Sequence, residues 1–195
     1  MGRAMTLDST ILDYLRGDGL LREGHFQFRS GHHSSVLLDR DRLLTDPVAA
    51  SRMGYALAKR FFTDHVATVV SPSIWGAGLA QWVAYFLDPK AKVVYASRPD
   101  DRLTIADNVR PLIEGQRVLL IDNLVISGET MTALAAMVET MGAEIVGLGT
   151  LWNSAELTVG DRPVFGLLNT RYDAYPPDQC PLCAAESSTA TSVDY

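Results

Sequence analysis

The stretch from Val118 to Met131 constrains the fold of this chain more than any other part of the sequence. It begins with an unbroken apolar run that ends at Ile121, a pattern typical of a strand covered on both faces of a sheet. Two short polar side chains, Asp122 and Asn123, stop the run, and a small-residue turn at 127–128 follows. Apolar side chains then recur at helical spacing, at Met131, Leu134, Met137, Val138 and Met141. The pattern predicts a buried strand, a tight turn and a helix in direct succession.

A strand, turn and helix joined in this way are suited to binding an anion. The backbone N–H groups of the turn and the positive end of the helix dipole converge there. Asp122 and Asn123, just before the turn, could hold a sugar attached to that anion. In the simpler alternative, Asp122 only caps the turn and binds no ligand.

The rest of the chain alternates between strand and helix patterns, which predicts an α/β fold with a parallel sheet. In such sheets ligands bind beyond the carboxyl ends of the strands. Three strand ends carry unusual loops, at 71–76, 98–115 and 122–130, and we expect the site there. The segment 98–115 reads as one long polar loop of a functional or mobile kind. We expect the strands near 66–70, 92–96, 118–122, 145–151 and 164–168, with a first helix at 11–16, a hairpin over 26–38 and a helix opening at Asp46.

Composition narrows the class of partner. The chain has 195 residues, 47% of them hydrophobic, which suffices for one domain with a proper core. Its net charge of −6 and its lack of a basic block argue against a nucleic-acid partner. No apolar run approaches the roughly 20 residues of a membrane span. Residues 1–5 lack the apolar core of a signal peptide. We therefore expect a cytoplasmic protein without a membrane partner.

Two cysteines and four histidines are the candidate soft metal ligands. Cys180 and Cys183 supply two of the four ligands of a structural zinc, and no histidine follows them, so we expect no zinc site unless a dimer shares one. A disulfide between them is not expected in a reducing cytosol. We expect His25 to be a packed or turn-bonding residue, whereas one of His32 and His33 could face a substrate.

Several ordered motifs together resemble the orotate phosphoribosyltransferase family. Residues 24–26 and 30–34 look like its N-terminal signature, and 71–76 sits at its pyrophosphate-binding loop. The segment 98–115 matches its flexible catalytic loop. The stretch 118–131 is similar to its motif for phosphoribosyl diphosphate (PRPP). Gly147 to Leu151 and the pair Cys180 and Cys183 recur in the longer form of the family. The resemblance covers most of the chain.

This resemblance implies a type I phosphoribosyltransferase fold, in which helices flank a five-stranded parallel core sheet beside a small N-terminal hood. It places one domain at 1–183, with a hood of about 1–45 plus the C-terminal part and a core of about 46–170. The tail 184–195 is small and polar, and we expect it to be disordered. The implied reaction moves the 5-phosphoribosyl group of PRPP onto a heterocyclic base, with orotate as acceptor and pyrophosphate released. The implied cofactor is Mg²⁺ carried by PRPP, with no direct side-chain ligand, and the implied assembly is a homodimer.

The resemblance also assigns roles to residues. The catalytic residues would be Arg98, Arg102 and Asp122. Base contacts from the hood would come from Ser30, His32, His33 and Ser34. The pyrophosphate loop would comprise Ser71, Pro72, Ser73, Ile74, Trp75 and Gly76. PRPP would bind to Asp122, Asn123, Val125, Ile126, Ser127, Gly128, Glu129 and Thr130.

The chain departs from the family pattern at several contact positions. Asn123 replaces the second of two acids, Ile126 replaces a threonine, and Trp75 replaces a glycine. The loop 98–115 has no lysine, which leaves arginine as its cation. Two alternatives therefore stay open beside the orotate enzyme: a regulatory protein that binds PRPP or a nucleotide without catalysis, and a transferase with a different acceptor base. If the missing charge at Asn123 weakens binding, Asn123→Asp should strengthen it.

Overall fold

The computed structural model of this protein describes residues 4–28, 30–169, 173–185 and 189–193. The chain divides into two compact units. One, the core unit, comprises residues 41–170, and the other, the hood unit, comprises residues 1–40 and 171–195. The hood and core expected from the sequence, with their limits, stay predictions.

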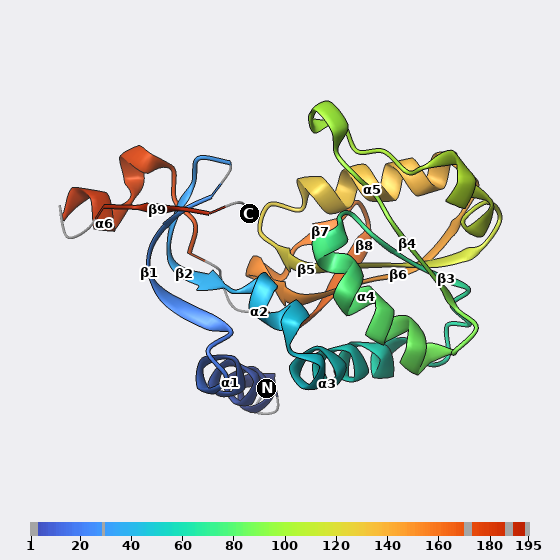
Figure 1. Ribbon diagram of the computed structural model, residues 1–195, viewed down its shortest axis with the longest axis horizontal. Helices are drawn as coiled ribbons and strands as arrows, with labels where there is room; N and C mark the ends of the chain where they lie inside the picture. The colour runs from blue at the N-terminus through green and yellow to red at the C-terminus, as the bar shows by residue number, and fades with distance from the viewer. Residues whose placement is uncertain (1–3, 29, 170–172, 186–188, 194–195) are drawn as a thin grey trace. The chain divides into compact units, whose positions relative to one another are not determined.

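The core unit is built on a six-stranded sheet with the order β4-β3-β5-β6-β8-β7 (Figure 1). Its first five strands in this order are parallel, and only the short edge strand β7 is antiparallel. This confirms the predicted α/β fold with a parallel core sheet. The strands are β3 (Thr68–Ser71), β4 (Lys92–Tyr95), β5 (Arg117–Val125), β6 (Glu144–Asn153), β7 (Thr158–Val159) and β8 (Arg162–Leu168).

Helices cover both faces of this sheet (Figure 1). On one face lies α5 (Glu129–Thr140), whose Met131, Leu134 and Val138 pack in a cluster with Val118 and Leu120 of β5. The other face carries α3 (Pro47–Ala58) and α4 (Ile74–Leu87). Because successive side chains of a strand point to opposite faces, β5 is buried on both sides. The remaining short elements are α2 (Arg40–Thr45), η1 (Lys59–Phe61), η2 (Pro99–Asp101), η3 (Asp107–Leu112) and η4 (Ser154–Glu156).

Particular residues explain where α3 begins and how closely β6 packs. Asp46 caps α3, since its Oδ1 accepts from the N–H groups of Val48 at 2.9 Å and Ala49 at 3.1 Å. Gly147 and Gly149 of β6 leave room for the ring of Phe61, because a Cβ at either position would lie within 3.3 Å of it. The glycine pattern of β6 is therefore a packing requirement of the fold.

The hood unit contains an antiparallel hairpin and a C-terminal segment. Helix α1 (Ala4–Gly17) starts earlier than the predicted 11–16, and β1 (Leu21–Gln27) then pairs with β2 (His33–Leu38). The C-terminal segment returns to the hairpin through η5 (Pro177–Gln179), α6 (Pro181–Ala184) and β9 (Thr191–Ser192), which pairs with β1. Disorder of the tail 184–195 stays a prediction, and its residues 186–188 and 194–195 lie outside the described residues. Within the described parts of the chain, no helix is long and apolar enough to cross a membrane.

Candidate active site

The connection from β3 to α4 forms the first part of the site. Ser71 ends β3 and is fully buried, and only Pro72 and Ser73 separate it from the helix. The Ser73 side chain caps α4 by accepting from the N–H of Gly76 at 3.4 Å, and the Ser71 hydroxyl donates to the Ser73 carbonyl at 3.0 Å. The predicted pyrophosphate loop 71–76 is thus a strand end, a two-residue turn and the first turn of a helix. Its backbone N–H groups lie at a helix N-terminus, where anions are favoured.

Gly76 lets this helix start very close to β3 and β5. A Cβ at position 76 would lie 2.3 Å from the Ser71 Oγ and 3.3 Å from the Asp122 Oδ1. The neighbouring Trp75 and Ile74 point outward and are 37% and 55% exposed. The glycine of this loop that the packing requires is therefore Gly76, and the indole of Trp75 lies at the surface.

We expect Gly76→Ala to destabilise the protein by about 1–3 kcal/mol, because overpacking of a tight site costs that much. Thermal unfolding measures the change. Gly17→Ala is the matched control, since a Cβ there meets nothing within 4 Å. Adding Ser71→Ala to the Gly76→Ala variant removes the closest atom and should restore part of the loss. A Gly76→Ala protein as stable as the Gly17→Ala control would contradict this packing.

Strand β5 carries the second part of the site, and it is longer than its apolar run. Pairing with β6 continues through Asp122, opposite Thr150, to Val125, opposite Asn153. The expectation that the strand stops at Asp122 was therefore wrong. The ladder to β6 satisfies the backbone beyond the polar pair and holds both side chains at fixed positions.

Asp122 and Asn123 have different environments. Asp122 is half-buried, and its Oδ1 accepts from the N–H of Asn123 at 2.8 Å. Asn123 is only 1% exposed, and its Nδ2 donates to the Trp75 carbonyl at 3.1 Å. Its Oδ1 is buried without a hydrogen-bond partner among the described residues. Asn123 therefore fastens β5 to the loop 71–76, while Asp122 is the member of the pair that solvent reaches.

The turn between β5 and α5 is the third part. Gly128 has a φ of +81° and precedes the first residue of α5 without a side-chain cap of its own. Ser127 Oγ accepts from the N–H of Glu129 at 3.4 Å, and Ile126, Ser127 and Glu129 are exposed. Backbone N–H groups at the start of a helix favour anions, so this turn is a candidate anion site, and anion binding there stays a prediction.

An arginine from the segment 98–115 reaches this turn. The Arg98 Nη2 donates to the Thr130 Oγ1 at 3.1 Å. Arg98 and Arg102 belong to a short loop, 98–103, which a pair of 2.8 Å hydrogen bonds between Ser97 and Thr104 closes (Figure 1). The Arg102 side chain is exposed, and within the described residues no carboxylate lies within ion-pair distance of its guanidinium.

The segment 98–115 is not one long exposed loop, because part of it packs against the core. Ile105 and Ile113 are buried in the core at 4% and 0% exposure, and η3 lies between them. These two apolar anchors hold the second half of the segment against the sheet. Only the part that carries Arg98 and Arg102 projects from the core unit.

The four residues predicted to contact the base lie in the hood unit. Ser30 and His32 are exposed, whereas His33 and Ser34 are buried in β2. The Ser34 Oγ accepts from the N–H of Val36 at 3.1 Å, and the His33 Nδ1 lies 2.9 Å from the His25 Nε2. Of the four, Ser30 and His32 are thus the ones whose side chains are open to a ligand.

The hood unit brings together four candidate metal ligands, His25, His33, Cys180 and Cys183. From the sequence, no histidine was expected to join the two cysteines. The ligand atoms of all four residues lie within 4.8 Å of one another. Both histidines precede the cysteines by about 150 residues along the chain, so a search for a histidine after the pair does not find them. Desolvation and the neighbouring Cys180 raise the pKa of the Cys183 thiol above its ordinary value.

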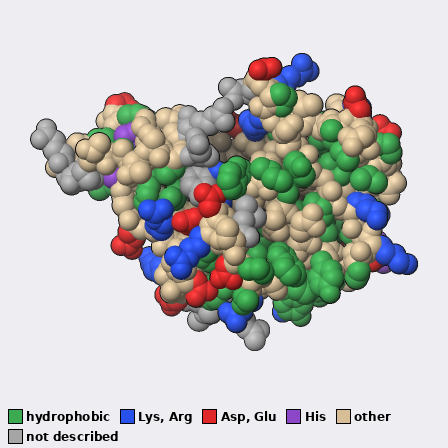
Figure 2. Space-filling model, in the orientation of Figure 1, with side chains coloured by type: hydrophobic (Ala, Val, Ile, Leu, Met, Phe, Trp, Pro, Cys, Tyr) green, Lys and Arg blue, Asp and Glu red, His purple; other side chains and the backbone are tan. Residues whose placement is uncertain are grey.

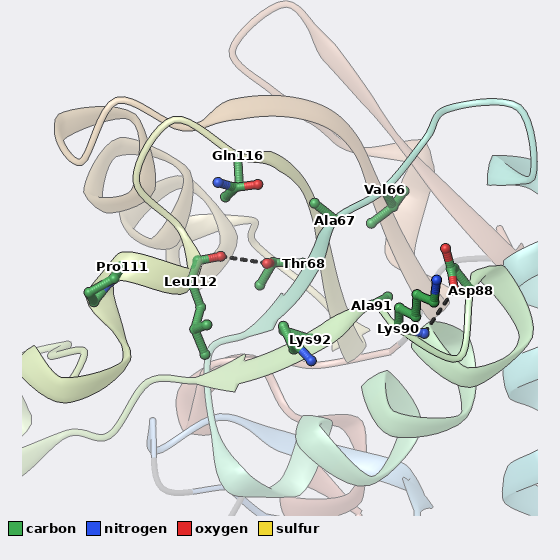
Figure 3. A pocket seen from close by; sticks show the side chains of 10 residues that line it. All are labelled: Val66, Ala67, Thr68, Asp88, Lys90, Ala91, Lys92, Pro111, Leu112 and Gln116. Atoms are coloured by element: carbon green, nitrogen blue, oxygen red, sulfur yellow. Dashed lines mark hydrogen bonds between the residues drawn. The ribbon is translucent and has the colours of Figure 1, made fainter.

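A hollow of about 400 Å³ lies elsewhere, beside the amino ends of β3 and β4 (Figure 3). Thr68 and Lys92 line it from the strands, Ala67 lines it from just before β3, and Leu112 lines it from η3. The Thr68 hydroxyl donates to the Leu112 carbonyl across it. Because ligands of parallel sheets bind at the opposite, carboxyl edge, we assign this contact to the anchoring of η3.

Comparison with known proteins agrees with this geometry. Residues 39–169 match the phosphoribosyl transferase domain family. The orotate phosphoribosyltransferase of Thermus thermophilus is 32% identical over 178 residues, which cover 89% of this chain and 94% of that protein. The orotate phosphoribosyltransferase of Thermotoga maritima is 31% identical over 180 residues, with 89% and 91% covered.

Solved structures show the same fold. The orotate phosphoribosyltransferase of Mycobacterium tuberculosis H37Rv superposes with a TM-score of 0.62 at 18% identity, covering 84% of this chain and 96% of that one. The adenine phosphoribosyltransferase of Thermoanaerobacter pseudethanolicus gives a TM-score of 0.59 at 22% identity, covering 69% and 88%. With its parallel sheet and these relatives, the chain belongs to the orotate phosphoribosyltransferase family of type I phosphoribosyltransferases.

Proposed function

We propose that this protein transfers the 5-phosphoribosyl group of PRPP to a ring nitrogen of orotate and releases pyrophosphate. The observation that carries the proposal is the bond from Arg98 to Thr130, which joins the cationic loop 98–103 to the anion-binding turn after β5. The names of the curated relatives supply the acceptor. In this reaction the bond from C1 of the ribose to pyrophosphate breaks, and a bond from C1 to the base nitrogen forms.

The binding roles follow from the three parts of the site. The 5-phosphate would accept from the N–H groups of 126–130 and from the hydroxyls of Ser127 and Thr130. Asp122, as the accessible acid, would accept hydrogen bonds from the ribose hydroxyls. The first turn of α4 and the preceding turn, 71–76, would receive the pyrophosphate through backbone N–H groups.

Catalysis would depend on charge. The transition state resembles an oxocarbenium ion, so stabilising the departing pyrophosphate is the main catalytic contribution. Arg98 is held at the phosphate turn, and Arg102 is a charged side chain that can turn toward pyrophosphate. Mg²⁺ bound to PRPP would neutralise part of the same charge when present. The half-buried carboxylate of Asp122 would lie near that ion, because it would hold the ribose hydroxyls of the same PRPP molecule.

The proposal also covers the residues that contact the base and the assembly of the protein. Ser30 and His32 are the exposed hood residues that would contact the base. The core unit exposes aromatic side chains at Tyr55 of α3, at Tyr85 of α4 and at Phe62 just after η1 (Figure 2). Aromatic side chains are enriched in protein interfaces, which supports a homodimer through this surface. The cytoplasmic location stays a prediction from the sequence.

The acceptor is tested by a panel of bases. The protein is incubated with PRPP and Mg²⁺ and with orotate, uracil, adenine or hypoxanthine in turn, and pyrophosphate release is followed. We expect release with orotate and little with the others. Release with another base but not with orotate would overturn the acceptor while leaving phosphoribosyl transfer intact.

A regulatory PRPP-binding protein is the second candidate. One observation favours it: the position of the second family acid holds Asn123, which is neutral, buried and bonded to Trp75 rather than open to a ligand. This candidate predicts saturable PRPP binding without pyrophosphate release for any base.

A further inference from the structure

We propose that the hood unit holds a structural zinc ion bound by His25, His33, Cys180 and Cys183. The inference does not depend on the proposed transferase activity. It begins from the four ligand atoms, His25 Nε2, His33 Nδ1 and the two Sγ atoms, which lie within 4.8 Å of one another. Two histidines and two cysteines form a ligand set typical of structural zinc sites.

The distances fit a tetrahedral ion. Zn–N bonds of about 2.05 Å and Zn–S bonds of about 2.3 Å imply ligand separations of roughly 3.3 Å for N to N and roughly 3.6 Å for N to S. The His25 Nε2 lies 2.9 Å from the His33 Nδ1 and 3.6 Å from each sulfur. The Cys183 Sγ lies 3.2 Å from the His33 Nδ1. Small adjustments of the side chains would therefore bring all four atoms to bonding distance of one ion.

The backbone of the hood unit places each ligand. The register of β1 against β2 shifts between Glu23 and Phe26, which breaks the alternation of the strand, so that His25 and Phe26 are both buried. His33 begins β2 and exchanges two backbone hydrogen bonds with Tyr175, at 2.7 and 2.8 Å. That pairing returns the C-terminal segment to the hairpin.

The two cysteines sit on one turn of this returning segment. The N–H of Ala184 donates to the Cys180 carbonyl at 3.0 Å across the short helix α6, which brings both sulfurs to the same side. Cys180 is 2% exposed, His25 6% and His33 7%, and Cys183 is the most exposed of the four. Spacing of two residues between the cysteines is common in zinc sites.

The chemistry of the four ligands favours zinc over magnesium. Thiolates and imidazoles are soft or borderline ligands that favour zinc, whereas Mg²⁺ prefers oxygen ligands, so Mg²⁺ added with PRPP would not compete. Two thiolates and two neutral imidazoles would balance the charge of Zn²⁺. A unit assembled from residues 1–40 and 171–195 also benefits from a cross-link, because chains below about 70–80 residues rarely supply a sufficient core. The ion would join the two ends of the chain.

Metal analysis of the full-length protein, purified without chelator, tests the site. We expect about one zinc ion per chain, and a fall to less than roughly a tenth in Cys183→Ser and His33→Asn. His32→Asn is the matched control for zinc content, because this exposed neighbour of His33 lies outside the cluster. Zinc retained at full content in both cluster variants would overturn the proposal.

A second measurement uses the unmodified protein, so that a folding defect in a variant does not decide the result. After removal of zinc, Co²⁺ is added alone. We expect the visible absorption of tetrahedral Co²⁺, together with thiolate-to-metal charge-transfer bands, and faster amide hydrogen exchange at 173–185 in the metal-free form. A protein that takes up neither Zn²⁺ nor Co²⁺, because the histidines only bond to each other or the cysteines form a disulfide, would overturn the proposal.

Discussion

Replacing Arg102 with alanine is expected to lower kcat by roughly 10²–10³-fold while the Kd for PRPP changes by less than about threefold. The physical reason is that an exposed guanidinium in the 98–103 loop contributes mainly when charge develops on the departing pyrophosphate. Removing a group that stabilises only the transition state lowers kcat without weakening ground-state binding. Steady-state kinetics and isothermal titration with PRPP measure the two quantities.

Two variants control this experiment. Arg110→Ala removes an arginine of the same segment whose guanidinium is turned to Asp107 and Glu114, each at 3.7 Å, and it should leave kcat nearly unchanged. Arg102→Lys keeps the charge but loses the planar fork, so an intermediate kcat is expected. An Arg102→Ala protein with the kcat of the Arg110→Ala control would show that the loop cation takes no part in catalysis.

Replacing Asn123 with aspartate is expected to destabilise the protein by roughly 3 kcal/mol, which lowers the Tm by about 6–12 °C in a chain of this size. The side chain is 1% exposed, and its Nδ2 donates to the Trp75 carbonyl. A carboxylate there loses this bond and sets a negative charge against a carbonyl oxygen. The sequence-based hypothesis that Asn123→Asp strengthens PRPP binding did not include this loss of stability.

The destabilisation caused by Asn123→Asp is expected to increase with pH. Burial raises the pKa of a carboxyl at position 123 above its unfolded value of about 3.9. The destabilisation is therefore small below about pH 4 and grows as pH rises through the folded pKa. Asn108→Asp makes the same chemical change at an exposed position and should leave the Tm within about 1 °C. If Asn123→Asp were as stable as this control and bound PRPP more tightly, the position of Asn123 would be misassigned.

Local patterns in the sequence predict most of the core unit. The apolar run before Asp122 and the helical spacing after Gly128 correctly indicate a buried strand, a turn and a helix, because each depends on neighbouring residues. Asp46 and Pro47 likewise mark the start of α3. The loops at 71–76 and 122–130 were expected at the carboxyl edge of the sheet, where β3 and β5 end.

Contacts between distant residues set the limits of that prediction. The length of β5 depends on its pairing with β6, and the burial of Asn123 depends on a carbonyl 48 residues away. Ile105 and Ile113 were the available signal that the segment 98–115 is anchored, since isolated apolar residues in a polar stretch often pack inward. The histidine and cysteine cluster has no local signature, because a strand bulge and a returning terminus assemble it.

The central claim is that the site after β5 transfers phosphoribosyl groups rather than only binding PRPP. Its most direct test follows one preparation by two readouts: the PRPP binding isotherm, and the nucleotide and pyrophosphate formed from PRPP, Mg²⁺ and orotate. We predict saturable PRPP binding together with orotidine monophosphate and pyrophosphate in equal amounts. Saturable binding with neither product formed would contradict the claim and identify the protein as a PRPP-binding regulator.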